Sequence, residues 1–487
     1  MLKYTGHPLV DVGAATIAAF SDKSELAQVT EADLERMADF IADNYVVNPL
    51  KSFLTVAFPD SGFTQPAFEK MPEKRKEYAE RVLRGFRKDA IRLAETCVFT
   101  GQPAAAIAFR QHVPLLTGEH VINFCPGGHA GLPVSGEALL CIQALPLGSA
   151  KCSGRLLLVH SDNPELTLDF ARAFLQQNRR VLQLARQATA KKMPEARFPA
   201  RTLLIQTLLD VEGKRQGAAE ERQPSSVTAY HLSNSGQSPA LDIYHLPLEM
   251  LGFLRQAISA EYRDQWMAIT QRAWQLPRPK KKAAKGQEGA AEEDNAPRRN
   301  MLYEDIFDLP GNAHRFLRTY FLRVPKRYAK GKEQRDDPRV TYSLKAEADL
   351  VSWNLTKLFL RRVMNMSKDR IQQISNLGDR LATYIAGQNA KDFFRVLYSQ
   401  GRYDYFRTSL LRADREHSMR SGNPLITLEE FYEVFEAEEE GILQADRWRW
   451  GRDLTLIRVV EQLCQNGWLA RHPDAVPETP EAQEPES

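Results

Sequence analysis

The sequence predicts an α+β protein, in which a mixed N-terminal domain with small antiparallel sheets and helices precedes an all-α C-terminal helical bundle. Two observations predict the sheets: short β-rich runs separated by Gly and Pro fill residues 97–162, and two further runs flank a polar turn at residues 234–238. A third predicts the bundle, because apolar residues recur at helical spacing from about residue 342 onward.

These patterns divide the chain into an N-terminal α+β domain at 1–341, a bundle at 342–472 and a disordered acidic tail at 473–487. Residues 277–300 carry almost no large apolar side chains and are predicted to be a disordered loop inside the first domain. With 487 residues, 43% of them hydrophobic, the chain is long enough to bury a substantial core.

The helices of the N-terminal domain are predicted from caps and apolar spacing. A first helix is expected from about Val12 to Phe20, with Asp11 as its cap. Thr30 and Asp33 form a capping box for the next helix. Residues 72–95 are predicted to be a basic helix, whose cations either meet phosphates or form an ordinary solvated face: Lys74, Arg75, Lys76, Arg81, Arg84, Arg87 and Lys88.

The predicted strands lie at residues 104–109, 120–128, 137–148 and 154–162. A long helix follows at about 164–190, and a hairpin spans residues 227–247. In the C-terminal bundle, apolar spacing predicts helices around 350–358 and 371–385 and one or two more within 390–417. Thr427 and Glu430 form a second capping box, and Gly467 is a predicted helix stop.

Charge is distributed unevenly along the C-terminal third. Residues 357–420 hold 13 Lys or Arg against 6 Asp or Glu, whereas residues 421–487 hold 5 against 15. The formal net charge of +3 does not by itself indicate a nucleic-acid-binding protein. No stretch approaches the roughly 18 consecutive apolar residues of a membrane span, and the first residues lack a signal-peptide pattern. We therefore expect a cytoplasmic protein without membrane contact.

Two short motifs were weighed as catalytic sites. Gly6, His7 and Asp11 lie close together in sequence but have no indicated nucleophile. His160, Ser161 and Asp162 end a predicted strand, yet three consecutive residues alternate across a strand and cannot converge by themselves. Capping of the following helix by Ser161, Asp162 or Asn163 explains the second motif better. We predict no catalytic residues.

Metal and cofactor motifs are not visible in the sequence. The ten histidines form no HExxH pattern. The five cysteines (Cys97, Cys125, Cys141, Cys152 and Cys464) form no repeated CxxC pair, so we expect reduced thiols that pack as small hydrophobic side chains. We predict no metal and no cofactor.

Several motifs, taken in order, resemble one family. They are YTGHPLVDVGAATIAA at 4–19, FPDSGFTQP at 58–66, CVFTGQPA at 97–104, ALPLGSAKCSGRLLLVHSDN at 144–163, YHLSNSGQSPALDIYHLP at 230–247 and PLITLEEFYEVF at 424–435. Their order and spacing resemble the large subunit of type I CRISPR Cascade complexes, most closely the type I-B branch that often carries two CxxC pairs. The chain departs from that branch: its first pair reads Cys97 to Thr100, and the second position offers Ser135 and Ala138. A zinc site implied by the family is therefore expected to be lost.

The resemblance implies a non-catalytic subunit of a cytoplasmic ribonucleoprotein in antiviral defense. Such a subunit recognises the protospacer-adjacent motif (PAM) in duplex DNA, aids strand separation and recruits a downstream effector, while guide pairing reads the sequence. The implied partners are crRNA, target double-stranded DNA and its displaced single strand, the backbone, handle-binding and small subunits, and a helicase-nuclease or transposition adaptor. The resemblance also makes internal translation initiation at Met364 or Met366 a hypothesis, against the alternative that both are core methionines.

Polar and basic side chains on predicted loops and helices are the candidates for nucleic-acid contact. Groove reading needs donors and acceptors on loops, and the motif-sensing candidates are Asn48, Lys51, Ser61, Gln65, Arg110, Gln111, Asn234 and Gln237. Backbone neutralisation needs cations, and the candidates in the bundle are Arg361, Arg362, Lys368, Arg370, Arg380, Lys391, Arg395, Arg402, Arg407 and Arg412. Two alternative functions stay open: a helical adaptor without nucleic-acid recognition, and a stand-alone hydrolase or nuclease.

Overall fold

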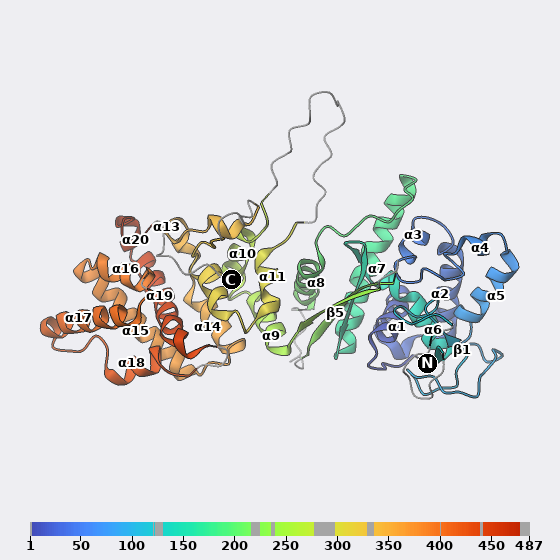
Figure 1. The fold of residues 1–487 in the computed structure, drawn as a ribbon, viewed down its shortest axis with the longest axis horizontal. Coiled ribbons are helices and arrows are strands. Elements are labelled where there is room, and N and C mark those ends of the chain that lie inside the picture. The colour runs from blue at the N-terminus through green and yellow to red at the C-terminus, as the bar shows by residue number, and fades with distance from the viewer. Residues whose placement is uncertain are drawn as a thin grey trace, which may run out of the picture. The chain divides into compact units, whose positions relative to one another are not determined.

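The computed structural model describes residues 2–119, 121, 130–215, 225–234, 239–276, 298–328, 336–399, 401–438 and 442–477. The chain divides into two compact units, Met1–Leu251 and Gly252–Ser487. The boundary that the sequence predicts, at residues 341 and 342, falls inside the second unit. Small antiparallel sheets and many helices confirm the α+β fold class (Figure 1).

The first unit contains helices α1 to α8 and the six strands found among the described residues. Its helices are α1 (Pro8–Phe20), α2 (Glu31–Asn44), α3 (Leu50–Leu54), α4 (Pro66–Glu69), α5 (Pro72–Leu83), α6 (Gly136–Ala144), α7 (Pro164–Gln187) and α8 (Ala200–Arg215). Its strands are β1 (Ala106–Ala108), β2 (Leu132–Val134), β3 (Ala150–Cys152), β4 (Arg155–Ser161), β5 (Val227–Ser233) and β6 (Ala240–Leu246).

Helix α1 lies at the centre of the core of the first unit. Its residues from Val10 to Ala19 are buried, and it packs against α6 and α7. A helix that is apolar all round must be enclosed by other elements. Small residues allow the close approach: a Cβ on Gly13 would lie 1.9 Å from the carbonyl oxygen of Cys141 in α6.

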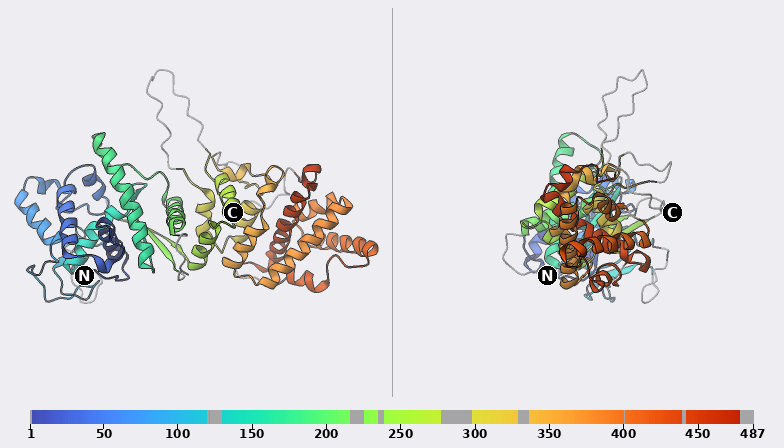
Figure 2. Two further views of the ribbon diagram at one scale, coloured as in Figure 1. Left: turned by 180° about the vertical axis from the view of Figure 1, so that it is seen from behind. Right: turned by 90° about the vertical axis from the view of Figure 1, so that its left-hand side faces the viewer.

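The main sheet is antiparallel and has the strand order β3-β4-β5-β6. Leu158 of β4 pairs with Tyr230 of β5, which pairs with Ile243 of β6. This register confirms the hairpin predicted at 227–247. Helix α7 packs on β4, and Figures 1 and 2 show it running beside the sheet. Asn163 caps α7 by accepting a hydrogen bond from the amide of Glu165, which decides between the three predicted caps.

The second unit is helical. Its helices are α9 (Leu248–Ala257, which crosses the boundary), α10 (Arg263–Arg272), α11 (Met301–Asp305), α12 (Ala313–Phe316), α13 (Leu344–Glu347), α14 (Trp353–Arg362), α15 (Lys368–Gln388), α16 (Lys391–Ser399), α17 (Tyr403–Ser421), α18 (Leu428–Phe435), α19 (Arg447–Gln465) and α20 (Trp468–Arg471). Helix α19 packs against α15 and α18. The capping boxes at Thr30 and Thr427 are both confirmed, as is the stop at Gly467, whose φ is +71°.

Four predictions about elements need correction. Helix α1 begins at Pro8 with His7 at its N-cap, so Asp11 lies inside the first turn. Helix α5 ends at Leu83 instead of residue 95. The predicted strand at 137–148 is helix α6, capped by Ser135. The predicted disordered loop is too long, because Asn300 is buried and caps α11. The predicted strand at 120–128 lies outside the described residues apart from Val121, which is in no strand.

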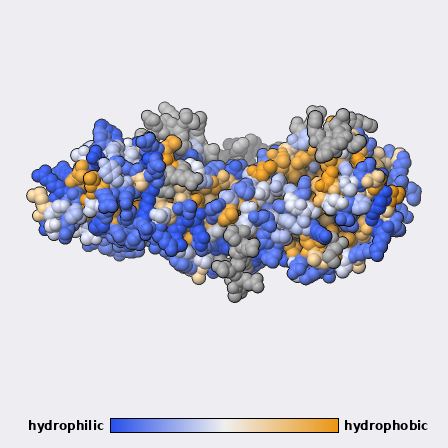
Figure 3. Space-filling view, turned by 90° about the horizontal axis from the view of Figure 1, so that it is seen from below, coloured by the Kyte–Doolittle hydropathy of each residue, from blue (hydrophilic) through white to orange (hydrophobic). Residues whose placement is uncertain are grey.

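The surface of the second unit is mostly hydrophilic on the face shown in Figure 3, where it occupies the left half. More of the hydrophobic residues on that face lie over the first unit, at the right. Within the described residues, no helix has the length and apolar composition that crossing a bilayer requires.

Candidate nucleic-acid interface

Three distant segments that carry the motif-sensing candidates meet in the first unit. The loop between α3 and α4 holds Ser61 and Gln65, the loop after β1 holds Arg110 and Gln111, and Asn234 follows β5. The Arg110 guanidinium donates to the carbonyl oxygen of Asn234 at 2.7 Å, and its Nε lies 3.6 Å from a carboxylate oxygen of Asp60. The structure therefore assembles one polar junction from segments that lie far apart in the sequence, with Arg110 and Asn234 separated by 124 residues.

Tyr78 of α5 contacts both loops of this junction. Its hydroxyl donates to Ser61 Oγ at 3.3 Å and to the Gln111 carbonyl at 3.2 Å. Its ring stacks on the His112 imidazole with centroids 5.7 Å apart. Gly62 is required here, since a Cβ on it would lie 2.6 Å from the Tyr78 ring. The two loops are thus fixed by the same aromatic side chain.

Two of the motif-sensing candidates, Ser61 and Asn234, are buried, so neither side chain is placed to enter a groove. Ser61 is 1% exposed and Asn234 is 0% exposed. The Asn234 amide groups donate to the carbonyl oxygens of Val56 and Ala57, at 2.8 Å from the main chain and 3.2 Å from the side chain. Both residues hold the junction together and present no donor to a groove. Gln237 lies outside the described residues.

Five candidates at or near the junction remain at least partly accessible, namely Asn48, Lys51, Gln65, Arg110 and Gln111. Asn48 is exposed, and Gln65 and Gln111 are partly exposed. The Gln65 amide donates to Asp60 Oδ1 at 3.1 Å, while Lys51 is ion-paired with Glu69. Amide side chains and a carboxylate are groups that hydrogen-bond to base edges in the major groove. The accessible candidates for such contacts are therefore the amides of Asn48, Gln65 and Gln111, and the Asp60 carboxylate is a further acceptor beside them that sequence reasoning missed.

Half of the basic candidates in the second unit already face carboxylates. Arg380 pairs with Glu430, Arg402 with Asp404, and Arg412 with Glu416. Lys391 pairs with Asp474, and Arg395 pairs with Asp392 and also approaches Asp474. A phosphate would have to displace these partners before it could use the cations.

The other five basic candidates have different surroundings. Arg362 donates to the Gln256 side chain at 3.0 Å, Arg370 donates to the Glu438 carbonyl, and Arg407 lies over the Phe431 ring. Arg361 and Lys368 are exposed, and neither contacts a carboxylate among the described residues. The end of α14 and the start of α15 are therefore the part of this set most open to a phosphate backbone.

Two cations of the basic segment at 72–95 form ion pairs within the first unit. Arg84 and Arg87 follow α5 and both pair with Glu35 of α2.

Sequence reasoning also missed a basic stretch of α7 and the loop after it. Residues 170–194 contain six Lys or Arg and no Asp or Glu, which is a readable signal. Five of these cations are exposed there, namely Arg179, Arg180, Arg186, Lys191 and Lys192.

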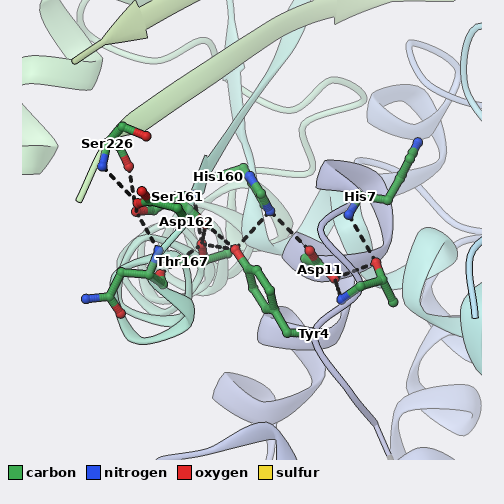
Figure 4. Close-up of polar contacts among 10 residues, drawn as sticks. Tyr4, His7, Asp11, His160, Ser161, Asp162, Thr167 and Ser226 are labelled. Atoms are coloured by element: carbon green, nitrogen blue, oxygen red, sulfur yellow. Dashed lines mark hydrogen bonds and ion pairs between the residues drawn. The ribbon is translucent and has the colours of Figure 1, made fainter. Parts of the chain in front are cut away.

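The two motifs weighed as catalytic sites come together (Figure 4). Asp11 is fully buried, and its carboxylate accepts hydrogen bonds from the amide and hydroxyl of Thr5, each at 2.7 Å. His160 Nε2 lies 3.1 Å from Asp11 Oδ2 and 2.8 Å from the Tyr4 hydroxyl. The Tyr4 hydroxyl also donates to the Ser161 carbonyl. This polar cluster ties the segment before α1 to the end of β4.

The remaining polar groups in Figure 4 stabilise the start of α7. Ser161 Oγ donates to the carbonyl of Ser226, the residue before β5, at 2.6 Å and not to His160. Thr167 Oγ1 accepts from the Ser161 amide at 3.0 Å. Burial raises the pKa of Tyr4 and lowers the pKa of His7. The arrangement couples an imidazole to a carboxylate, and its contacts fasten α1, β4 and α7 together.

The four positions that the resemblance relates to a zinc site also converge. Thr100 Oγ1 donates to Ser135 Oγ at 3.2 Å, and Ser135 Oγ accepts from the Ala138 amide at 3.4 Å. Burial opposes ionisation of the neighbouring Cys97 thiol, but hydrogen bonds from Thr100 and Ser135 outweigh it and lower its pKa. Only one of the four side chains is a thiol, so these residues do not fit a tetrahedral zinc site. Among the described residues, Cys97, Cys141, Cys152 and Cys464 form no disulfide bond.

Comparison of the chain with models of protein families, with curated proteins and with solved structures found no match.

Proposed function

We propose that this chain is the non-catalytic large subunit of a type I-B-like crRNA-guided Cascade complex in the cytoplasm. In this role it recognises the protospacer-adjacent motif in duplex DNA, aids strand separation, and recruits a helicase-nuclease or a transposition adaptor. Guide pairing carries the sequence specificity, so the protein needs only a short-motif reader and surfaces for nucleic-acid backbones. The proposal starts from the order of motifs along the sequence.

The observation that carries the proposal is the polar junction in the first unit. Segments around Gln65 and Gln111 are held side by side by Tyr78, although the sequence shows no reason for them to meet. A reader of base edges needs several donors on a rigid support. The amides of Gln65 and Gln111, together with Asp60, meet that requirement.

A second observation supports the family resemblance. Cys97, Thr100, Ser135 and Ala138 occupy the positions where the resemblance implies two ligand pairs, and three of them join in one hydrogen-bonded group beside Cys97. Convergence of these positions is what a family member that has lost its zinc would show. Hydrogen bonds between hydroxyls and an amide would then replace metal bonds at this place.

The proposal is tested by a mobility-shift assay on the assembled crRNA complex. The complex would carry the wild-type chain or the double variant Gln65→Ala, Gln111→Ala, and would be titrated with matched duplexes that differ in the flanking motif. A bidentate base contact contributes about 1–3 kcal/mol of discrimination. We therefore expect the double variant to lose about tenfold or more of its preference for the best motif.

The matched control is Gln176→Ala, Gln177→Ala, which removes two exposed amides from α7. It should keep the wild-type motif preference. If the Gln65 and Gln111 variant keeps the wild-type motif preference, the residues that recognise the motif lie elsewhere in the chain. Motif-dependent binding by a complex that lacks this chain would overturn the proposal and favour the adaptor function.

A further inference from the structure

The segment after α20 docks on α16 by charge. The Asp474 carboxylate accepts hydrogen bonds from Lys391 Nζ at 2.9 and 3.0 Å. Arg395, one turn further along α16, donates to the Asp474 carbonyl at 3.0 Å, and its Nη2 lies 3.8 Å from Asp474 Oδ2. The predicted tail at 473–487 therefore begins with residues that contact the bundle.

Apolar burial holds this segment in place. Ala475 is 0% exposed and Val476 is 5% exposed, and the Ala475 amide donates to the His472 carbonyl. The His472 ring packs on Trp468, which in turn contacts Phe394 of α16. Ion pairs at a surface contribute only about 0–1 kcal/mol by themselves. Because the neighbouring residues are buried, Asp474 is presented to Lys391 and Arg395 instead of sampling many positions.

The sequence that follows continues the same charge. Residues 478–487 include Glu478, Glu481, Glu484 and Glu486 and no Lys or Arg. Four extended residues reach at most ~14 Å, which is comparable to the ~8–10 Å over which charges act at physiological salt. The length of the chain after Pro477 therefore allows the first glutamates to approach the cations on α16 closely enough to interact with them.

We propose that the acidic C-terminal segment is an intramolecular ligand of the basic face of α16, formed by Lys391 and Arg395. Carboxylates and phosphates bind Lys and Arg through the same charge-assisted hydrogen bonds. The segment thus competes with a nucleic-acid backbone for these cations; this competition rests on the proposed function, whereas the intramolecular contact does not. Nucleic acid gains these two cations only when the acidic segment is displaced.

The first test measures binding of a fluorescein-labelled oligothymidylate to the full chain and to a tail variant. The tail variant carries five changes: Asp474→Asn, Glu478→Gln, Glu481→Gln, Glu484→Gln and Glu486→Gln. Each cation that single-stranded DNA gains steepens the salt dependence of log K by about 0.7. We expect the variant to bind several-fold more tightly at low salt, with a slope steeper by about 0.7–1.4, because Lys391 is released while Asp392 stays beside Arg395.

Two controls separate this effect from a change in net charge. Neutralising five exposed acids elsewhere in the second unit (Glu261, Asp264, Asp349, Asp369 and Glu429) should give a smaller gain and no such change in slope. Adding Lys391→Gln and Arg395→Gln to the tail variant should remove the gain. Equal tightening by both sets of five, or a gain that persists without Lys391 and Arg395, would overturn the proposal.

The second test does not depend on nucleic-acid binding. Carbodiimide cross-linking of the full chain, followed by peptide mass spectrometry, would compare links from Glu478 and Glu481 to Lys391 with links to the exposed Lys345. A clear preference for Lys391 supports the intramolecular contact, and equal use of the two lysines overturns it. If no variant binds the oligonucleotide, the competition and the nucleic-acid function both fail, while the cross-links still decide the contact.

Discussion

At the residue scale, Asp11 shows how burial changes the role of a side chain. The sequence predicts it as a helix cap, but it lies inside the first turn of α1 and is 0% exposed. A buried carboxylate is tolerated only when hydrogen bonds replace its water. Thr5 and His160 supply them, so Asp11 fixes the chain before α1 to the end of β4.

Asp11→Asn should destabilise the protein by about 1–3 kcal/mol, because the amide cannot accept from both Thr5 and His160 and loses the charge-assisted bonds. Urea unfolding followed by circular dichroism measures the change. The control Asp43→Asn, at an exposed position of α2, should stay within about 0.5 kcal/mol of wild type. Equal stability of the two variants would show that the polar cluster does not stabilise the fold.

His112 predicts a pH dependence of stability. Burial lowers its pKa to about 3, and the Arg81 charge acts in the same direction. Its Nδ1 accepts a hydrogen bond from the Phe109 amide, which only the neutral imidazole can do. The unfolded chain takes up this proton near pH 6.5, so the folded state loses stability as pH falls from about 6.5 toward 3.

His112→Asn keeps an acceptor but removes the proton site, so the variant should lose less stability than wild type between pH 7 and pH 5. The difference is at most about 1.4 kcal/mol per pH unit for one proton. Chemical unfolding at several pH values tests this, with the exposed His245→Asn as the control that should keep the wild-type dependence. Parallel curves for His112→Asn and wild type would mean that another group carries the dependence.

At the scale of elements, helix α6 explains the main error in the strand predictions. Residues 137–148 are almost wholly apolar, and such a run is compatible with a buried strand or a buried helix. Ser135 caps the helix through the Ala138 amide, and this local signal was available in the sequence. Helix α6 packs against α1, α2 and α5. A helix buried on every side is apolar on every side, so its sequence shows no helical periodicity.

Gly13→Ala tests the contact between α1 and α6. Alanine normally favours a helix over glycine by about 1 kcal/mol, but its Cβ would lie 1.9 Å from the Cys141 carbonyl oxygen. We expect a net loss of stability of 1–3 kcal/mol or more, as overpacked cores show roughly that cost. Gly213→Ala in α8 is the matched control, since nothing lies within 4 Å of its Cβ. It should be neutral or stabilising in the same unfolding experiment, and similar behaviour of both variants would contradict the close packing.

At the scale of the whole molecule, the basic surface available to a polyanion depends on how many cations have carboxylate partners, and less on the total number of cations. The sequence shows an excess of cations at 357–420, and the structure pairs half of the candidates there with carboxylates. Cations that already have carboxylate partners neutralise fewer phosphates. A nucleic acid that binds them therefore releases fewer counterions. The basic surface available to a polyanion is therefore smaller than the sequence indicates.

The triple variant Arg361→Gln, Arg362→Gln, Lys368→Gln should weaken binding of single-stranded DNA and flatten the salt dependence of log K by about 2, at roughly 0.7 per cation. The matched triple variant Arg380→Gln, Arg402→Gln, Arg412→Gln should change the slope by less, because Glu430, Asp404 and Glu416 face those side chains. Filter binding over a series of KCl concentrations measures both. Equal slopes for the two variants would show that pairing does not govern which cations bind.

The sequence by itself determined the α+β class, the hairpin, the capping boxes and the helices of the second unit from α14 to α19, because these signals act within about four residues along the chain. Only the tertiary structure decided which polar residues are buried, as at Asp11, Ser61 and Asn234, and which distant segments meet at Tyr78 or beside Cys97. It also decided which cations have carboxylate partners. Contacts of this kind depend on how whole elements pack, and packing joins residues whose separation along the chain carries no local signal.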